Sequence, residues 1–291
     1  MHTRLASGLP RRGMQAGHLK PQASAADNQQ IAPIRALAMC RLVAYLGEPI
    51  FLDTLVCAPQ HSLVHQSLRA EQAHTVTNGD GFGVGWYGER EDPGLYREVM
   101  PAWSDDNLLA LCASVRSPLF FAHVRAATGG GIARQNCHPF RHGRWMFMHN
   151  GQIGGYALVR RTLESRLPDN LYASRRGATD SELLFLLALA RIEAGESPDE
   201  SMHAVLADTL GLMRAAGVAA PLRFAAALSD GDQVYAFRFA SDEAPPTLYV
   251  GESEQGSIVA SEPLDGRSNH WRAVPANSWL RMSRHGVAVQ A

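Results

Sequence analysis

The chain has 291 residues, of which 46% are hydrophobic and 19% are charged, enough to bury a large core in one large domain or two small ones. The formal net charge of −1 indicates no basic face for nucleic acid, and no apolar run is long enough to span a bilayer. The four cysteines form no CxxC pair and no spacing typical of a disulfide framework, so a location in the reducing cytoplasm is expected.

The first 39 residues differ from the rest of the chain. They contain basic residues, few strong apolar residues and no hydrophobic periodicity. A secretory signal needs an apolar core of about 7 to 15 residues, and this segment contains none. Residues 1–39 are therefore expected to be a disordered extension, a propeptide or a wrongly assigned start, and residues 40–291 to be the functional domain.

From residue 40 onward, hydrophobic patterns predict regular elements in chain order. The first half mixes strands at 40–47, 81–88, 94–100, 119–128 and 145–153 with helices at 62–72 and 104–117, the second helix capped by Ser104. The middle is helical at 156–167, 180–195 and 199–217. The last third returns to strands at 223–231, 233–240, 247–252, 257–263 and 278–283. Strands, then helices, then strands predict a layered α+β domain.

A glycine-rich stretch, "GDGFGVG" at residues 79–85, invites comparison with dinucleotide-binding loops. Such a loop must follow a strand and open a helix. Here the glycines lead into a Trp-Tyr strand, so the pattern does not predict a nucleotide site.

Four short motifs carry chemically useful side chains, and each has an ordinary structural interpretation as well. "HVRAAT" (123–128) ends an apolar strand, where a lone arginine is usually a surface charge. "NCHPF" (136–140) is typical of a turn fixed by its proline, and "HNGQI" (149–153) contains Asn-Gly, the strongest short hairpin signal. "TDSELLF" (179–185) offers a helix cap in its Thr-Asp pair.

Taken together with the Met39–Cys40 pair and "SIVASEPLDG" at 257–266, these motifs, in this order and spacing, resemble the class II glutamine amidotransferases. That family consists of N-terminal-nucleophile (Ntn) hydrolases whose first residue is a catalytic cysteine. The resemblance covers residues 40–291 and is greatest for the stand-alone YafJ-like subgroup, which includes an ergothioneine-pathway amidohydrolase. It implies a four-layer αββα sandwich with two mostly antiparallel sheets between helix layers.

The implied chemistry is hydrolysis of a γ-glutamyl amide through a thioester on Cys40. A free thiol has a pKa of about 8.5, whereas an α-amino group has a pKa of about 7.7–8.0. If Cys40 is the first residue, its own amine can take the thiol proton, as in N-terminal threonine nucleophiles. The resemblance makes the Asn150 side-chain amide and the Gly151 backbone N–H the donors that stabilise the oxyanion.

The resemblance also implies how the γ-glutamyl group is held. Arg125 is the expected partner of the α-carboxylate, because its planar fork can bind both oxygens. Thr128 can add a hydroxyl contact, and Asp180 is the expected partner of the α-ammonium group. His123 and His138 are expected to hold strand and turn structure rather than to catalyse.

Two positions depart from the pattern of synthase-linked family members. Ala126 stands where they usually have tryptophan, and Gly129 stands where they often have histidine. Both departures weaken the expectation that ammonia passes to a sugar-phosphate or purine synthase. A small-molecule γ-glutamyl substrate is expected, with no cofactor, metal, nucleic acid or membrane. An ammonia-accepting partner enzyme and the oligomeric state are left open.

Alternatives from other classes are kept open. A metal site would draw its ligands from Cys137, His138, His142 and His149, whose sulfur and nitrogen atoms suit zinc. Another thiol hydrolase would use Cys112 or Cys137 as its nucleophile, although both are expected to be packed side chains.

A third alternative keeps the Ntn fold without catalysis. If the preceding residues stay attached, Cys40 has no free amine and the proposed proton acceptor is missing. Cys40 becomes the first residue if translation starts at Met39 and the methionine is removed, or if residues 1–39 are a cleaved propeptide.

Overall fold

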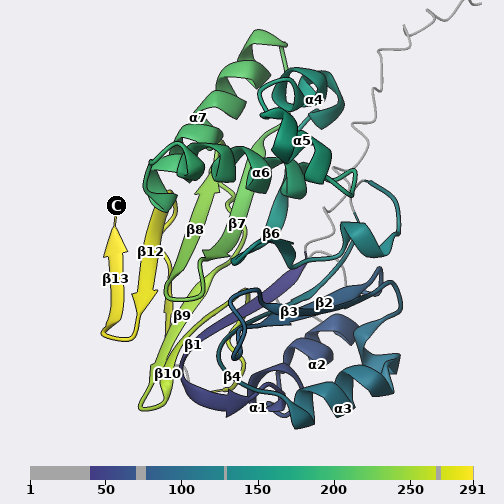
Figure 1. The fold of residues 1–291 in the computed structure, drawn as a ribbon, viewed down its shortest axis with the longest axis vertical. Helices are drawn as coiled ribbons and strands as arrows, with labels where there is room; N and C mark the ends of the chain where they lie inside the picture. Colours follow the sequence, from purple (N-terminus) through teal and green to yellow (C-terminus); the bar gives the residue numbers. More distant parts are fainter. Residues whose placement is uncertain (1–39, 70–76, 128–129, 267–269, 291) are drawn as a thin grey trace, which may run out of the picture. The chain divides into compact units, whose positions relative to one another are not determined.

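Two antiparallel sheets form the centre of the protein in a computed structural model that describes residues 40–69, 77–127, 130–266 and 270–290 (Figure 1). Sheet A consists, in spatial order, of β11 (Trp271–Ala273), β9 (Tyr249–Ser253), β10 (Gly256–Ala260), β1 (Arg41–Phe51), β4 (Arg116–Val124), β2 (Phe82–Trp86) and β3 (Gly94–Glu98). Sheet B consists of β13 (Gly286–Gln290), β12 (Ser278–Ser283), β8 (Val234–Ala240), β7 (Leu222–Ser229), β6 (Trp145–Ile153) and β5 (Phe140–His142).

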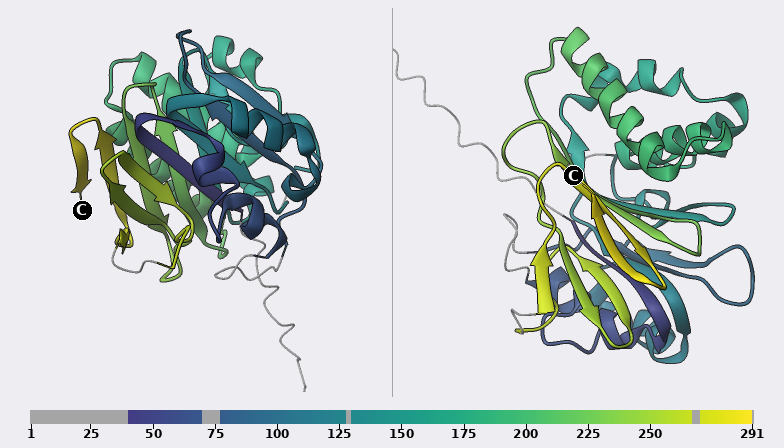
Figure 2. Two further views of the ribbon diagram at one scale, coloured as in Figure 1. Left: turned by 90° about the horizontal axis from the view of Figure 1, so that it is seen from below. Right: turned by 90° about the vertical axis from the view of Figure 1, so that its left-hand side faces the viewer.

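Helices cover the outer face of each sheet (Figures 1 and 2). Sheet A packs against α1 (Asp53–Val56), α2 (Leu63–Leu68) and α3 (Asp106–Ser114). Sheet B packs against α4 (Tyr156–Glu164), α5 (Asp169–Ser174), α6 (Asp180–Glu193) and α7 (Pro198–Ala215). The predicted four-layer αββα sandwich is therefore confirmed.

The strand sequences explain why both faces of each sheet are buried. In β1, Leu42 and Ala44 point into the core between the sheets, whereas Val43 points into the core beneath α1, α2 and α3. In β6, Met148 belongs to the core between the sheets and Phe147 stacks on Phe185 of α6 with ring centroids 5.4 Å apart. Alternate side chains of a strand face opposite sides, so a continuous apolar run lies between two apolar layers.

The helix predicted at 104–117 begins later and is shorter than the sequence indicated. Ser104 lies in a short 3₁₀ helix and its hydroxyl donates to the Pro101 carbonyl oxygen (2.9 Å), so the prediction that it caps the helix is wrong. The cap is Asp105, whose carboxylate accepts from the Leu108 backbone N–H (2.7 Å). A carboxylate at this position also complements the positive end of the helix dipole.

The glycine-rich stretch leads into β2 and opens no helix, as predicted. A Cβ atom on Gly83 would lie 2.2 Å from the His138 carbonyl oxygen, and one on Gly85 would lie 2.5 Å from Met146 Sδ. Both contacts are shorter than van der Waals separation, so these glycines serve close packing of β2 against the β5–β6 region.

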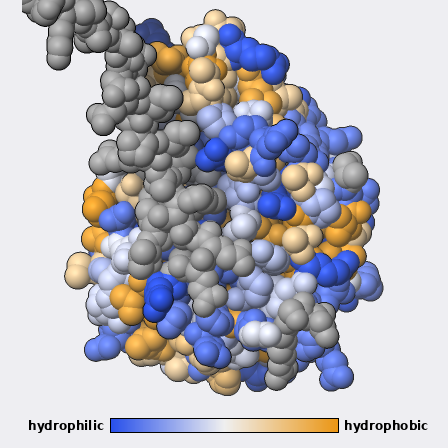
Figure 3. Space-filling model, turned by 180° about the vertical axis from the view of Figure 1, so that it is seen from behind, coloured by the Kyte–Doolittle hydropathy of each residue, from blue (hydrophilic) through white to orange (hydrophobic). Residues whose placement is uncertain are grey.

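Within the described ranges, no helix combines the length and the apolar character that crossing a bilayer requires. On the face shown in Figure 3, hydrophobic side chains are scattered among hydrophilic ones.

Candidate active site

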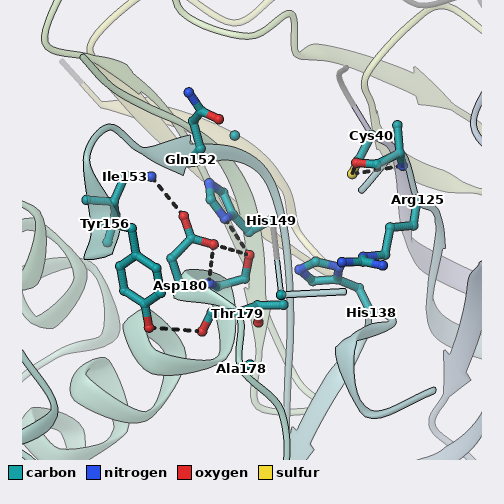
Figure 4. A pocket seen from close by; sticks show the side chains of 14 residues that line it. Cys40, Arg125, His138, His149, Gln152, Ile153, Tyr156, Ala178, Thr179 and Asp180 are labelled. Atoms are coloured by element: carbon teal, nitrogen blue, oxygen red, sulfur yellow. Dashed lines mark hydrogen bonds between the residues drawn. The ribbon is translucent and has the colours of Figure 1, made fainter. Parts of the chain in front are cut away.

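A cavity of about 110 Å³ brings together side chains from both sheets and from α6. Four residues predicted as site residues line it: Cys40, Arg125, Gly151 and Asp180. Figure 4 labels Cys40, Arg125 and Asp180 around this space. Cys40 immediately precedes β1 and Arg125 immediately follows β4, while Gly151 lies on β6 and Asp180 begins α6. These residues are as much as 140 positions apart in the sequence, and the sandwich places them around one space. Thr128 lies outside the described residues.

The Cys40 thiol is held by the loop that follows β4. The Ala126 backbone N–H donates to Cys40 Sγ (3.4 Å), and the thiol donates to the Ala126 carbonyl oxygen (3.5 Å). Burial raises the pKa of the Cys40 thiol, and the Ala126 contact and the charges of Arg125 and Arg41 only partly oppose that effect. A thiol in this environment needs a base to become a nucleophile.

The backbone of Cys40 is held by Arg41, a residue that the sequence analysis did not single out. Arg41 Nη1 donates to the Cys40 carbonyl oxygen (2.9 Å), and Arg41 Nε lies 2.7 Å from Glu262 Oε1. Both side chains of this ion pair are buried. Glu262 belongs to the "SIVASEPLDG" stretch, so that motif contributes to the site through Arg41.

Arg125 is positioned by the "GDG" turn before β2. Its backbone N–H donates to the Gly81 carbonyl oxygen (2.8 Å), and its carbonyl oxygen accepts from the Asp80 N–H (3.0 Å). The Asp80 carboxylate accepts from the Ala127 N–H (2.7 Å). Arg125 is only 3% exposed, so its interpretation as a surface charge is wrong.

Gly151 lies inside β6, not in a hairpin turn. Asn150 and Gly151 both pair with β7, opposite Ala225 and Phe224, so the hairpin interpretation of Asn-Gly is wrong. Gly151 has φ 148°, and a Cβ atom there would lie 2.0 Å from the Arg223 carbonyl oxygen. Only glycine fits this position, because any side chain would separate β6 from β7.

Asn150, the neighbour of Gly151, does not line the cavity. It follows Met146 and Met148 at two-residue spacing, and these two methionines pack between the sheets. The Asn150 side chain is buried, and neither its oxygen nor its nitrogen bonds to a described residue.

Asp180 joins the beginning of α6 to the end of β6. Its carboxylate accepts from the backbone N–H groups of Ile153 and Ser181, each at 2.8 Å. Thr179 is the helix cap, because its hydroxyl accepts from the Glu182 N–H (3.1 Å), and Asp180 is the first helical residue. The Asp180 carboxylate is thereby fixed at the cavity wall.

Asn136 of the "NCHPF" motif ties two loops of the cavity together. Its amide nitrogen donates to the Gly130 carbonyl oxygen (2.5 Å), and its amide oxygen accepts from the Ala178 N–H (2.9 Å). Gly130 and Ala178 both line the cavity. Asn136 therefore connects the segment after Arg125 to the segment before α6, a role that the sequence analysis missed.

Comparison with known proteins assigns the family. Residues 53–244 match the family described as glutamine amidotransferases class-II. The chain belongs to this family. The probable glutamine amidotransferase DUG3 of Saccharomyces cerevisiae is 30% identical over 299 residues, which cover 86% of this chain and 84% of that protein. A γ-glutamyl-hercynylcysteine sulfoxide hydrolase of Mycobacterium tuberculosis is 29% identical over 256 residues, which cover 87% of this chain and 97% of that protein.

A solved structure agrees with this assignment. A glutamine aminotransferase class-II domain protein from Silicibacter pomeroyi superimposes with a TM-score of 0.67 and is 37% identical. The match covers 86% of this chain and 98% of that one. The protein is therefore an enzyme of the class II glutamine amidotransferase family with the Ntn-type fold.

Three buried histidines lie around the cavity of this amidotransferase. His123 Nε2 donates to the His149 carbonyl oxygen (3.3 Å), and the Ser181 hydroxyl lies 2.8 Å from His149 Nδ1. The His138 ring packs against the His123 ring, with centroids 4.2 Å apart and the ring planes tilted by 34°. Burial lowers the pKa of all three, that of His123 to about 3, so all three imidazoles are neutral at neutral pH.

The alternative sites considered from the sequence gain no support. Across the described ranges, no three His, Cys, Asp or Glu residues are grouped so that they could hold a metal ion. Cys112 and Cys137 are buried, and the Cys137 thiol donates to the Glu98 carbonyl oxygen (3.4 Å). These two cysteines are packed side chains, as the sequence indicated.

Proposed function

We propose that this amidotransferase hydrolyses the γ-glutamyl amide bond of glutamine or of a related γ-glutamyl amide through a thioester on Cys40. The products are glutamate and ammonia or an amine. The observation that carries the proposal is the cavity in which Cys40, Arg125, Gly151 and Asp180 meet. A thiol, a cation, an anion and a backbone donor are the groups that such a reaction requires.

The charges of the cavity complement an α-amino acid. The Arg125 guanidinium pairs with the α-carboxylate, and the Asp180 carboxylate, held by two backbone N–H groups, pairs with the α-ammonium group. The side-chain amide of the substrate then extends towards Cys40. Thr128 remains a predicted contact to the α-carboxylate.

The reaction proceeds in two steps. Cys40 Sγ attacks the amide carbon, and the thiol proton passes to the base. The C–N bond then breaks as the base gives that proton to the leaving nitrogen. A water molecule next attacks the thioester carbonyl, which releases glutamate and restores the thiol. In both steps the Gly151 N–H at the cavity wall stabilises the oxyanion. The Asn150 amide, which lies outside the cavity and has no partner among the described residues, remains the second donor predicted from the sequence. Loss of one oxyanion donor typically costs about 3–4 kcal/mol.

The base in this mechanism is the α-amino group of Cys40. Because burial raises the pKa of the Cys40 thiol, a neighbouring proton acceptor is needed, and an α-amine has a pKa of about 7.7–8.0. In the full sequence this nitrogen is bonded to Met39. The active form therefore begins at Cys40, either by translation from Met39 and methionine removal or by cleavage of a propeptide, residues 1–39.

Two measurements test the proposal. The intact mass of the protein purified from its own cells is expected to correspond to a chain that begins at Cys40. The Cys40→Ala variant is expected to fold and to lose glutamine hydrolysis, whereas Cys57→Ala, outside the cavity, keeps it. A mature chain beginning at Met1, or wild-type activity in Cys40→Ala, overturns the mechanism. Absence of turnover on every γ-glutamyl amide would favour the catalytically silent scaffold.

A second candidate substrate is γ-glutamyl hercynylcysteine sulfoxide. The observation that favours it is the similarity to the M. tuberculosis hydrolase, which extends over 97% of that protein. Comparison of kcat/KM for glutamine, γ-glutamyl peptides and the sulfoxide distinguishes these substrates. Transfer of ammonia to a partner enzyme and a cytoplasmic location remain predictions from the sequence.

A further inference from the structure

The core between the sheets changes from apolar to polar as it approaches the cavity. Most of its side chains are leucine, alanine, methionine and valine. His123 continues the inward-facing row of β4 formed by Leu119 and Phe121. In the part of the chain that the structure describes, His123 Nδ1 and both ring nitrogens of His138 have no hydrogen-bond partner. A buried polar atom without a partner costs about 1–3 kcal/mol, so such groups gather where a ligand can satisfy them.

Of His123 and His138, it is His138 that lines the cavity, together with His149. It is 3% exposed, and its ring is held on one side by His123 and on another by Phe140, whose ring centroid is 4.6 Å away at 67°. Packing therefore fixes the orientation of the ring, and its two nitrogens are buried without a partner among the described residues. Figure 4 shows the ring beside the Arg125 guanidinium, on the same wall of the cavity.

The charge state of His138 suits a hydrogen-bonding role. Burial lowers its pKa well below the usual value of 6.5, and the nearby Arg125 guanidinium lowers it further. A neutral imidazole has one donor nitrogen and one acceptor nitrogen. It adds a donor next to Arg125 without placing a second positive charge there.

A carboxylate can accept several hydrogen bonds at once. Its two oxygens offer about four acceptor positions, and a guanidinium fork occupies two of them. A further donor beside the fork therefore increases affinity and fixes the orientation of the carboxylate. The neutral ring of His138 provides such a donor on the wall that carries Arg125.

We propose that His138 is a substrate-binding residue that donates a hydrogen bond to the α-carboxylate of the γ-glutamyl group, beside Arg125. This inference rests on the proposed function and extends it. It replaces the purely structural role that the sequence predicted for His138.

The test compares two amides that differ only in the α-carboxylate, L-glutamine and 4-aminobutanamide. His138→Phe keeps an aromatic ring against His123 and removes both nitrogens. For L-glutamine, kcat/KM is expected to fall about tenfold, mainly through KM, which corresponds to one hydrogen bond of about 1.4 kcal/mol. For 4-aminobutanamide the change is expected to be less than about twofold, because the hydrogen bond has no acceptor there. His138→Gln, which returns a donor, is expected to recover part of the loss.

A purely structural role would lower kcat/KM for both amides by the same factor, and that result, or an unchanged KM for L-glutamine, overturns the proposal. His142→Phe, on β5 and outside this cavity, serves as the matched control and is expected to leave both values unchanged. Melting temperatures establish that each variant is folded.

A binding measurement separates this inference from the proposed function. If the wild type hydrolyses no γ-glutamyl amide, the proposed function fails. Calorimetric affinities for L-glutamate and 4-aminobutanoate in wild type and His138→Phe then test His138 alone. A tenfold loss for L-glutamate only supports its role, whereas equal losses, or no binding of L-glutamate by the wild type, overturn it.

Discussion

Arg41 Nε and Glu262 Oε1 lie 2.7 Å apart, and their side chains are only 0% and 5% exposed. Arg41 begins β1 and Glu262 follows β10, the strand that pairs with β1. Because Arg41 also donates to the Cys40 carbonyl oxygen, the ion pair fixes the first residue of β1 and, through it, the backbone of Cys40, the proposed nucleophile. A buried pair of this kind supports position and specificity more than it adds net stability.

Removal of one partner of this pair is expected to be costly. Glu262→Ala leaves the Arg41 guanidinium buried without this carboxylate, so the free energy of unfolding should fall by about 3–5 kcal/mol. Glu262→Gln keeps a hydrogen-bond acceptor and should lose less. Urea denaturation measures both changes, and glutamine turnover should fall in the same order.

The exposed pair between Arg272 and Glu252 provides a control. Its side chains are 62% and 48% exposed, so Arg272→Ala should change the free energy of unfolding by less than about 1 kcal/mol. If Glu262→Ala were as stable as Arg272→Ala, the structural importance assigned to the buried pair would be wrong.

Local sequence patterns predicted the order of most strands and helices because apolar periodicity reports which faces are buried. They failed in two ways. Ser104 and Asp105 can both cap a helix, and the Asp105 carboxylate takes the position. Asn-Gly at 150–151 is a hairpin signal by composition, but here the close approach of the Arg223 carbonyl oxygen requires a glycine inside a strand.

The residues that position the site were harder to predict because their partners are distant in sequence. Arg41 sits in an apolar run, and its carboxylate partner is 221 residues away. Asn136 bonds to Ala178 across 42 residues, and no local pattern pairs them. By contrast, Cys40, Arg125 and Asp180 were identified through motifs, which carry this long-range information implicitly.

The geometry of the Arg125 guanidinium should matter as well as its charge. Arg125→Lys keeps the positive charge but cannot bind both carboxylate oxygens in a fixed plane. Charge-assisted hydrogen bonds contribute about 1.5–3 kcal/mol, so KM for glutamine is expected to rise about tenfold to a hundredfold with a smaller effect on kcat. Steady-state kinetics measure this change.

Arg134 is a suitable comparison for Arg125. Its side chain is 65% exposed and pairs with Glu98, so Arg134→Lys is expected to leave KM unchanged. A fall in kcat with unchanged KM in Arg125→Lys would contradict a role in binding the substrate.

Gly151→Ala tests the close contact between β6 and β7. The added Cβ atom would lie 2.0 Å from the Arg223 carbonyl oxygen and 2.6 Å from His149 Nε2. Since the strands must separate locally, the free energy of unfolding should fall by about 1–3 kcal/mol and the proposed oxyanion donor should move. Both thermal stability and kcat are expected to fall.

Gly211 in α7 provides the opposite case. Nothing lies within 4 Å of a Cβ atom at this position, so Gly211→Ala should stabilise the helix by roughly 0.5–1 kcal/mol without changing kcat. If Gly151→Ala behaved in the same way, the steric argument for glycine in β6 would fail.

The buried histidines predict that stability decreases as the pH falls below about 6.5. Burial lowers the pKa of His123 to about 3 in the folded protein, whereas the unfolded chain takes up the proton near pH 6.5. Between these values the unfolded state binds more protons, so stability is full above pH 6.5 and, for this residue, declines by about 1.4 kcal/mol for each pH unit below it.

Urea denaturation at pH 7.5 and 5.5 measures the effect, and His123→Asn should reduce the difference in unfolding free energy between the two pH values by about 1.4 kcal/mol. His285, which is exposed, is the control, and its Asn variant should keep the wild-type difference. An unchanged difference in His123→Asn would show that this imidazole does not resist protonation in the folded state.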